Sequence, residues 1–216
     1  RQMCIRDSID PADFAEKMCG LQFTFADISE AHDAIGLTAT SGVIITIPQR
    51  DGTRLDYELD GKTAFIDQSL VAENQIGRLN FTMMHEAAHQ LFWMLYPEEY
   101  EVQTPRCVFR MADEHTQYPV LNWEEWQTNV LTSYLLLPKE LVYRHMADVG
   151  LKDGVSVLNR IYARKDYERF SEAAKRLGVS KTALTIRLSQ LGLVGRNDLY
   201  DPYALVDIFP EKNEIA

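Results

Sequence analysis

Cysteine is scarce in this sequence, and the few cysteines form no recognisable pattern. Cys4, Cys19 and Cys107 are the only three among 216 residues, and no Cys-x-x-Cys pair occurs. An odd count without a repeated spacing argues against a disulfide framework. We therefore expect a reducing compartment.

Long apolar runs and a secretion signal are also missing. No apolar stretch approaches the 18 residues typical of a membrane-spanning helix, and no basic segment followed by an apolar one opens the chain. We therefore expect a cytoplasmic protein. Residues 1–8 (RQMCIRDS) show no periodicity and do not begin with Met, so we interpret them as a non-native scar. The length then suits a single domain over residues 9–196, followed by an acidic tail over 197–216.

Positive charge is in the minority, and it is concentrated in one stretch. The net charge is −10, yet residues 160–196 hold nine Lys/Arg against three Asp/Glu. So acidic a chain is a poor general binder of nucleic acid, which leaves this basic stretch as the exception to be explained.

Hydrophobic periodicity predicts an α+β fold, mostly helical with one small sheet. The predicted helices cover residues 9–21, 29–35, 78–96, 123–137 and 138–148, and the chain to Leu191 is mostly helical. Three predicted strands at 43–47, 55–59 and 63–67 are separated by the turn signals Asp51-Gly52 and Asp60-Gly61. We therefore expect a small antiparallel sheet at residues 42–67, before the helix at 78–96. Residues 98–121 are predicted to form a long loop.

The helix predicted at 78–96 carries the sequence His85-Glu86-Ala87-Ala88-His89. Positions i and i+4 lie on one face of a helix, so both imidazoles can bind one Zn²⁺. Zinc lowers the pKa of a bound water to about 7, and Glu86 is placed to take its proton as general base. The alternative is a pair of histidines on an ordinary amphipathic helix. The apolar flanks favour the metal, because buried histidines need partners.

A catalytic zinc site needs a third protein ligand. The downstream candidates are His115 in the predicted loop and Glu124 and Glu125 on the next helix. Asn129 follows Glu125 by one helical turn, where its amide could orient a ligating imidazole. This spacing favours Glu125 but leaves the choice open. The same ligands would also accept Mn²⁺ or another divalent ion.

The chain resembles the ImmA/IrrE family of metallopeptidases. That family pairs a helix of the type R-F-T-x-x-H-E-x-x-H with a second of the type E-x-x-A-[ND]-x-F-A-x-x-L-[LM]-x-P. The sequence has LNFTMMHEAAH at residues 79–89 and EWQTNVLTSYLLLP at 125–138, and the second match has no gaps. It departs from the family at Thr128 and at Leu131-Thr132, which changes packing rather than coordination.

The resemblance implies a zincin-like fold with Zn²⁺ as cofactor. It assigns Glu125 as the third metal ligand and Asn129 as the residue that orients a ligand. It further implies a cytoplasmic peptidase of narrow specificity, whose protein substrate is a helix-turn-helix transcriptional repressor cleaved in a stress response.

Residues 171–191 have the form of a helix-turn-helix, with a turn at Gly178-Val179-Ser180. DNA binding is one interpretation of this basic segment. We favour the other, a helical hairpin packed onto the catalytic core.

Further candidates lie in the region predicted as a loop. His115, Tyr118 and Arg110 could stabilise an oxyanion, and Cys107 could act as an inhibitory ligand. Two alternatives to a peptidase also remain at this stage: a DNA-binding regulator, and a protein that sequesters a regulator through a non-catalytic metal site.

Overall fold

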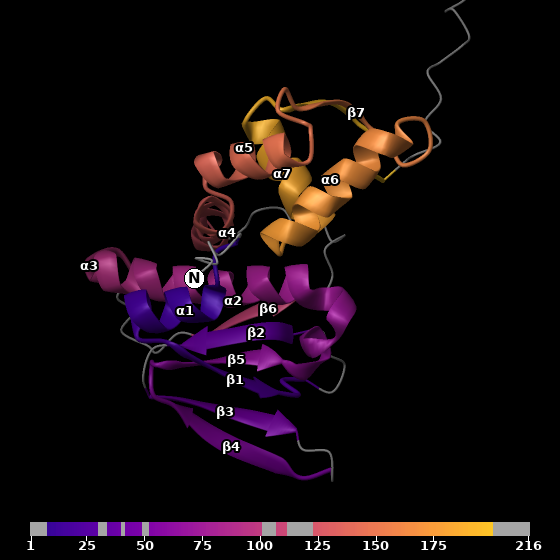
Figure 1. Ribbon diagram of the computed structural model, residues 1–216. Coiled ribbons are helices and arrows are strands. Elements are labelled where there is room, and N and C mark those ends of the chain that lie inside the picture. Colours follow the sequence, from indigo (N-terminus) through magenta and orange to yellow (C-terminus); the bar gives the residue numbers. More distant parts are fainter. Residues whose placement is uncertain are drawn as a thin grey trace, which may run out of the picture.

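The chain folds into three layers, with one long helix in the middle (Figure 1). The computed structural model describes residues 8–29, 34–39, 42–48, 52–100, 107–111 and 123–200. Strands form the layer below the central helix α2 (Ile76–Leu95), and the later helices form the layer above it. The expected α+β class is confirmed. Among the described helices, none combines the length and hydropathy needed to cross a bilayer.

The main sheet has four strands. In spatial order they are β1 (Gln22–Ala26), β5 (Thr63–Asp67), β2 (Ala34–Ala39) and β6 (Cys107–Met111). β1 and β5 run parallel, whereas β2 is antiparallel to both of its neighbours. The pairing of β2 with β6 shifts register between Ala34 and Gly36. Ile35 is buried in one cluster with Met83 of α2, and Gly36 lies beneath Glu86 of the same helix.

A separate hairpin packs beside this sheet. It consists of β3 (Val43–Pro48) and β4 (Arg54–Leu59), paired antiparallel along their full length. Ile45, Ile47 and Leu59 are buried in one cluster with Leu37 and Phe65 of the main sheet. The hairpin therefore covers the face of the main sheet that points away from α2.

The other face of the sheet supports α2 and the first helical segment. That segment consists of α1 (Pro11–Phe14) and a wider helical turn, η1 (Ala15–Cys19), and ends at Gly20 in the left-handed conformation. Two short turns, η2 (Gln68–Val71) and η3 (Glu73–Gln75), lead from β5 into α2. Apolar side chains on this face bury one side of α2, which fixes the orientation of its other side.

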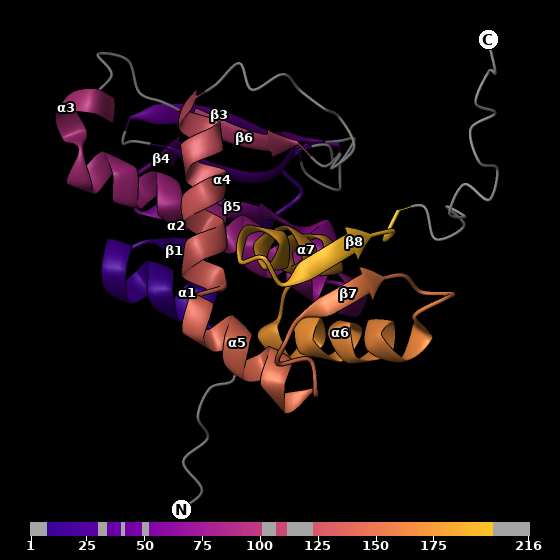
Figure 2. The same cartoon turned by 90° about the horizontal axis from the view of Figure 1, so that it is seen from above.

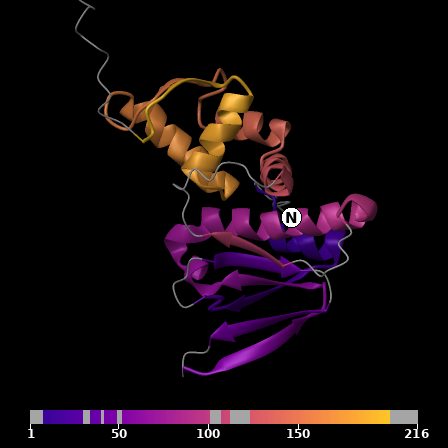
Figure 3. The same cartoon turned by 180° about the vertical axis from the view of Figure 1, so that it is seen from behind.

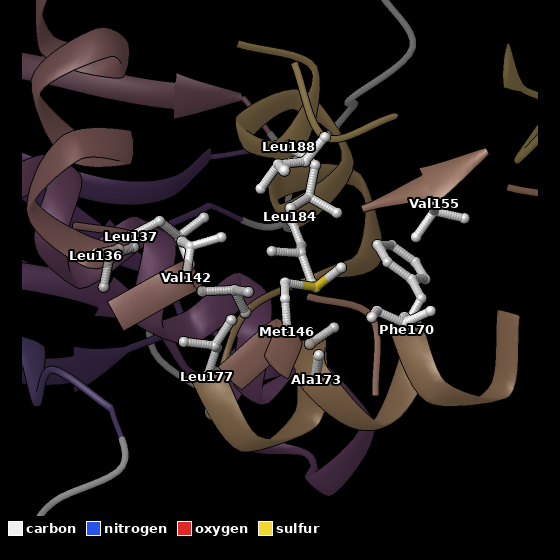
Figure 4. Close-up of a cluster of buried hydrophobic side chains, with 14 of the residues drawn as sticks. Leu136, Leu137, Val142, Met146, Val155, Phe170, Ala173, Leu177, Leu184 and Leu188 are labelled. Carbon is white, nitrogen blue, oxygen red and sulfur yellow. The ribbon is translucent and has the colours of Figure 1, made fainter. Parts of the chain in front are cut away.

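The upper layer begins with α4 (Trp123–Leu136), which crosses α2 in the view of Figure 2. The remaining elements are α5 (Lys139–Asp148), β7 (Val155–Leu158), α6 (Arg164–Leu177), α7 (Lys181–Gln190) and β8 (Val194–Asn197). β7 and β8 pair in parallel. Side chains from α4, α5, α6 and α7 meet in the largest core cluster, shown in Figure 4.

Several predicted elements are wrong. The end of the helix expected at 29–35 is contradicted by β2, because Ala34–Ala39 is extended, and residues 30–33 of that prediction lie outside the described residues. β2 is buried on both faces, so the alternation that reveals a strand is absent. The strand at 63–67 exists, but it joins β1 and β2 rather than the hairpin, so the expected antiparallel sheet is in fact a mixed sheet plus a hairpin. The expected loop at 98–121 contains the end of α3 (Pro97–Tyr100) and the whole of β6. Strands β1, β7 and β8 were not predicted.

Candidate metal centre

The predicted ligands converge where α2 meets α4. His85 and His89 lie on the upper face of α2, and Glu125 lies in the first turn of α4. The two Nε2 atoms are 3.1 Å apart. Glu125 Oε2 is 3.2 Å from Nε2 of His85, and Oε1 is 3.1 Å from Nε2 of His89. Each carboxylate oxygen of Glu125 thus contacts one imidazole, and the three residues from two helices form a group positioned to hold a metal ion, with one ligand atom of each within 4.8 Å of the others.

The dimensions of this group suit zinc. A tetrahedral ion with bonds of about 2.0–2.1 Å separates its ligand atoms by about 3.3 Å, close to the distances seen. Two imidazoles and one carboxylate are also a donor set used by catalytic zinc sites, in which a fourth position stays open to solvent or substrate. The described residues contribute no fourth ligand to the group.

Burial distinguishes the three ligands. The side chain of His85 is 1% exposed and that of His89 is not exposed, whereas that of Glu125 is 31% exposed. Partial burial raises the pKa of Glu125, but hydrogen bonds and charge from His85 and His89 outweigh this effect and hold the pKa well below its usual value. Glu125 is therefore an anion at neutral pH, the form that a metal ligand requires.

Thr128 fixes the orientation of His89. Its hydroxyl donates to the backbone oxygen of Glu124 at 2.8 Å, and its Oγ1 lies 3.4 Å from Nδ1 of His89. The single hydroxyl proton is used toward Glu124, so Oγ1 accepts from an Nδ1–H of the imidazole. Nε2 of His89 faces Glu125 and His85. In the metal-free protein this nitrogen can donate a proton to Glu125, and when a metal binds it gives up that proton and offers its lone pair. Trp93 stacks on the same imidazole, with ring centroids 6.0 Å apart.

Glu86 occupies the space between α2 and the sheet. It is fully buried, and its carboxylate stands over Gly36 of β2, where even a single Cβ atom would collide with it. This glycine lies where the pairing of β2 with β6 shifts register. The strand thus leaves room for a buried carboxylate next to the first metal ligand.

The other candidate residues are placed differently. Asn129, which we expected to orient a ligating imidazole, is exposed on α4, and the residue of α4 that contacts the imidazole of His89 is Thr128. Glu124 Oε1 lies 3.9 Å from Nδ1 of His89, too far for a direct hydrogen bond. Arg110 and Cys107 lie on β6, at one edge of the main sheet. His115 and Tyr118 lie outside the described residues.

Two residues of the site were missed from the sequence. Thr128 stands where the resembling family has alanine, and we interpreted that difference as a change of packing only. Gly36 directly follows the helix that we predicted at 29–35, and we assigned it no role in the site. Thr128 follows Glu124 by four residues, one helical turn, and this spacing could have placed Thr128 on the same side of the helix as the candidate ligands. No local pattern in the sequence places Gly36 beneath Glu86, because the two residues lie on segments that are distant in the sequence.

The predicted helix-turn-helix segment forms two helices with the expected turn. Gly178 adopts the left-handed conformation at the end of α6, and Ser180 caps α7 through the backbone N–H of Ala183. Arg187 of α7 is buried, donates to the backbone oxygen of Leu137, and lies 4.1 Å above the ring of Tyr134. One cation of the basic segment is therefore used to dock α7 onto the end of α4.

We compared the chain with protein-family models and with curated proteins. No protein-family model matches the chain, and no curated protein matches it.

Proposed function

We propose that this protein is a zinc-dependent peptidase. The observation that carries the proposal is the convergence of His85, His89 and Glu125 on one point, with a buried carboxylate, Glu86, directly after the first of them. A purely structural metal site would require no such carboxylate beside its ligands, and burying one is costly. The family resemblance of the two helices supports the same conclusion.

The residues of the site divide the work of hydrolysis. His85, His89 and Glu125 hold the zinc, which when bound supplies Lewis acidity and lowers the pKa of a water molecule toward 7. Glu86 takes the proton of the attacking water on a carboxylate oxygen and then delivers it to the nitrogen of the leaving amine. Thr128 holds the imidazole of His89 in the tautomer that presents Nε2 to the metal.

Replacing the general base separates a peptidase from a protein that only sequesters its partner. We expect Glu86→Gln to retain zinc and to lose at least about 100-fold in cleavage, because general-base catalysis contributes about 10²–10⁴-fold. A degenerate peptide library, with new termini counted by mass spectrometry, measures this without knowledge of the substrate. Glu140→Gln on α5 is the matched control. Equal cleavage by wild type and Glu86→Gln would contradict a peptidase that uses Glu86 as its base.

We further propose that the natural substrate is a helix-turn-helix transcriptional repressor, as in the family that the two helices resemble. This part rests on the resemblance alone. Incubating the protein with candidate repressors, with Glu86→Gln as the inactive partner, tests it: a repressor cut only by the wild type is the expected result.

A further inference from the structure

A pocket separate from the metal centre lies at the N-terminal end of α2. Its volume is about 470 Å³, and it is lined by the first turn of α2, by α6 and by the start of α7. Figure 3 shows these three helices from behind. Gly77 lies directly against the backbone of Val179 and Ser180, so the first turn of α2 meets the start of α7 without an intervening side chain. His85 lies eight residues further along α2, about 12 Å away along the helix axis.

The described residues that line this pocket include three cations and no acid. The cations are Arg78, Lys175 and Lys181. Nζ of Lys181 donates to the hydroxyl of Tyr167 at 3.0 Å and lies 5.0 Å from the centre of its ring, which holds the ammonium in place. The pocket therefore presents concentrated positive charge on a chain that is acidic as a whole.

The guanidinium of Arg78 is partly buried beside this pocket. Its Nε and Nη2 atoms are buried, and neither has a hydrogen-bond partner in the described structure. The Oγ of Ser171, which also lines the pocket, is buried in the same way. Part of the Arg78 guanidinium is thus removed from water without a hydrogen-bond partner, which is costly, and an anion in the adjacent pocket would offset that cost.

Two helix ends add to the attraction. Both α2 and α7 begin at the pocket, and the positive end of a helix dipole favours an anion. Gln75 precedes α2 and, within the described part of the chain, no side chain caps the first turn of that helix. The N-termini of two helices and three cationic side chains thus face one space.

We propose that this pocket binds the phosphate group of a small phosphorylated ligand. Tetrahedral oxyanions suit a site that combines helix N-termini with Arg and Lys. The volume falls within the range of small-molecule sites. The net charge of −10 repels a long polyanion, so the structure favours a small ligand over nucleic acid.

Inorganic phosphate is the probe for this proposal, added to zinc-loaded, ¹⁵N-labelled protein and followed by amide chemical shifts. We expect the amides of Gly77 and Lys181 to move first. Arg78→Gln should weaken phosphate binding at least about tenfold, since hydrogen bonds to charged groups contribute about 1.5–3 kcal/mol. Arg144→Gln removes the same charge from an exposed site on α5 and should leave the affinity unchanged.

Three results would overturn the proposal. The first is that phosphate shifts only amides around His85 and Glu125, which would make it a ligand of the metal. The second is that Arg78→Gln and Arg144→Gln weaken binding equally, which would indicate a general charge effect. The third is that a DNA duplex moves the pocket amides at lower concentration than phosphate does.

The melting temperature of Arg78→Gln shows whether a loss of phosphate binding is caused by unfolding of the variant. Removing a partly buried charge whose Nε and Nη2 atoms have no hydrogen-bond partner in the described residues should not lower the melting temperature in phosphate-free buffer. Should this variant unfold nonetheless, the exposed Lys175 replaces it, and Lys175→Gln must then weaken phosphate binding relative to Arg144→Gln for the proposal to stand.

Discussion

Thr128 is the residue through which α4 controls the imidazole of His89. Its hydroxyl accepts from Nδ1 because its own proton is donated to the backbone oxygen of Glu124. We expect Thr128→Val to weaken zinc binding about 10- to 100-fold, as found when hydrogen-bond partners of ligating histidines are removed. Competition with a chelator of known affinity measures the change. Thr128→Ser keeps the hydroxyl, and an equal loss in both variants would disprove the role of that hydroxyl.

Gly36 provides the space in which the carboxylate of Glu86 lies. A methyl group at this position would displace the carboxylate, while the ligands on the upper face of α2 would stay in place. We therefore expect Gly36→Ala to lose cleavage and stability but to retain zinc, as measured by peptide hydrolysis, thermal unfolding and elemental analysis. Shortening the acid in the double variant Gly36→Ala/Glu86→Asp should recover part of the lost melting temperature. No recovery would mean that the methyl group acts elsewhere.

Glu125 makes the metal-free protein sensitive to acid. Its pKa is lowered on folding from 4.5, so the folded state favours its ionised form. The stability that this carboxylate contributes is present above about pH 4.5 and is lost as the pH falls through the lower folded pKa. We expect the free energy of unfolding of chelator-treated Glu125→Gln, measured in urea, to fall less steeply between pH 6 and pH 3 than that of the wild type. Identical slopes would contradict this contribution.

At the scale of elements, the helices of the site could be predicted and the strands beneath it could not. α2 and α4 show a helical period over many residues, and both lie within two residues of their predicted bounds. β2 is buried on both faces, so its sequence lacks alternation. One of the two partners of β5 is β1, which lies 41 residues earlier in the chain by their paired positions Gln22 and Thr63. Local patterns identify elements but do not choose which strands pair.

The hairpin of β3 and β4 contributes to the stability of the sheet that supports α2. Ile47 is 1% exposed in the cluster beneath the sheet, whereas Ile44 on the same strand is 68% exposed. We expect Ile47→Ala to lower the free energy of unfolding by about 2–4 kcal/mol and Ile44→Ala by about 0.5 kcal/mol or less. Urea unfolding measures both. Equal effects would mean that the hairpin does not pack against the sheet as described.

At the scale of the whole molecule, charge and packing argue against DNA binding by residues 171–191. Leu184, Thr185, Arg187 and Leu188 of α7 are all buried, which leaves a narrow face for a groove of DNA. The net charge of −10 also opposes association with a polyanion. We expect no duplex binding with a Kd below about 1 µM at 0.15 M salt, as measured by fluorescence anisotropy. Tight binding that weakens steeply with salt would favour the DNA-binding alternative.

The metal content of the purified protein tests the central claim most directly. Elemental analysis after gel filtration should find one zinc ion per chain in the wild type and in Asn129→Ala, whose side chain is exposed. His85→Ala and Glu125→Gln should each lose that zinc while remaining folded by circular dichroism. A wild type without a stoichiometric divalent metal after incubation with zinc, or ligand variants that retain it, would contradict a metal centre formed by α2 and α4.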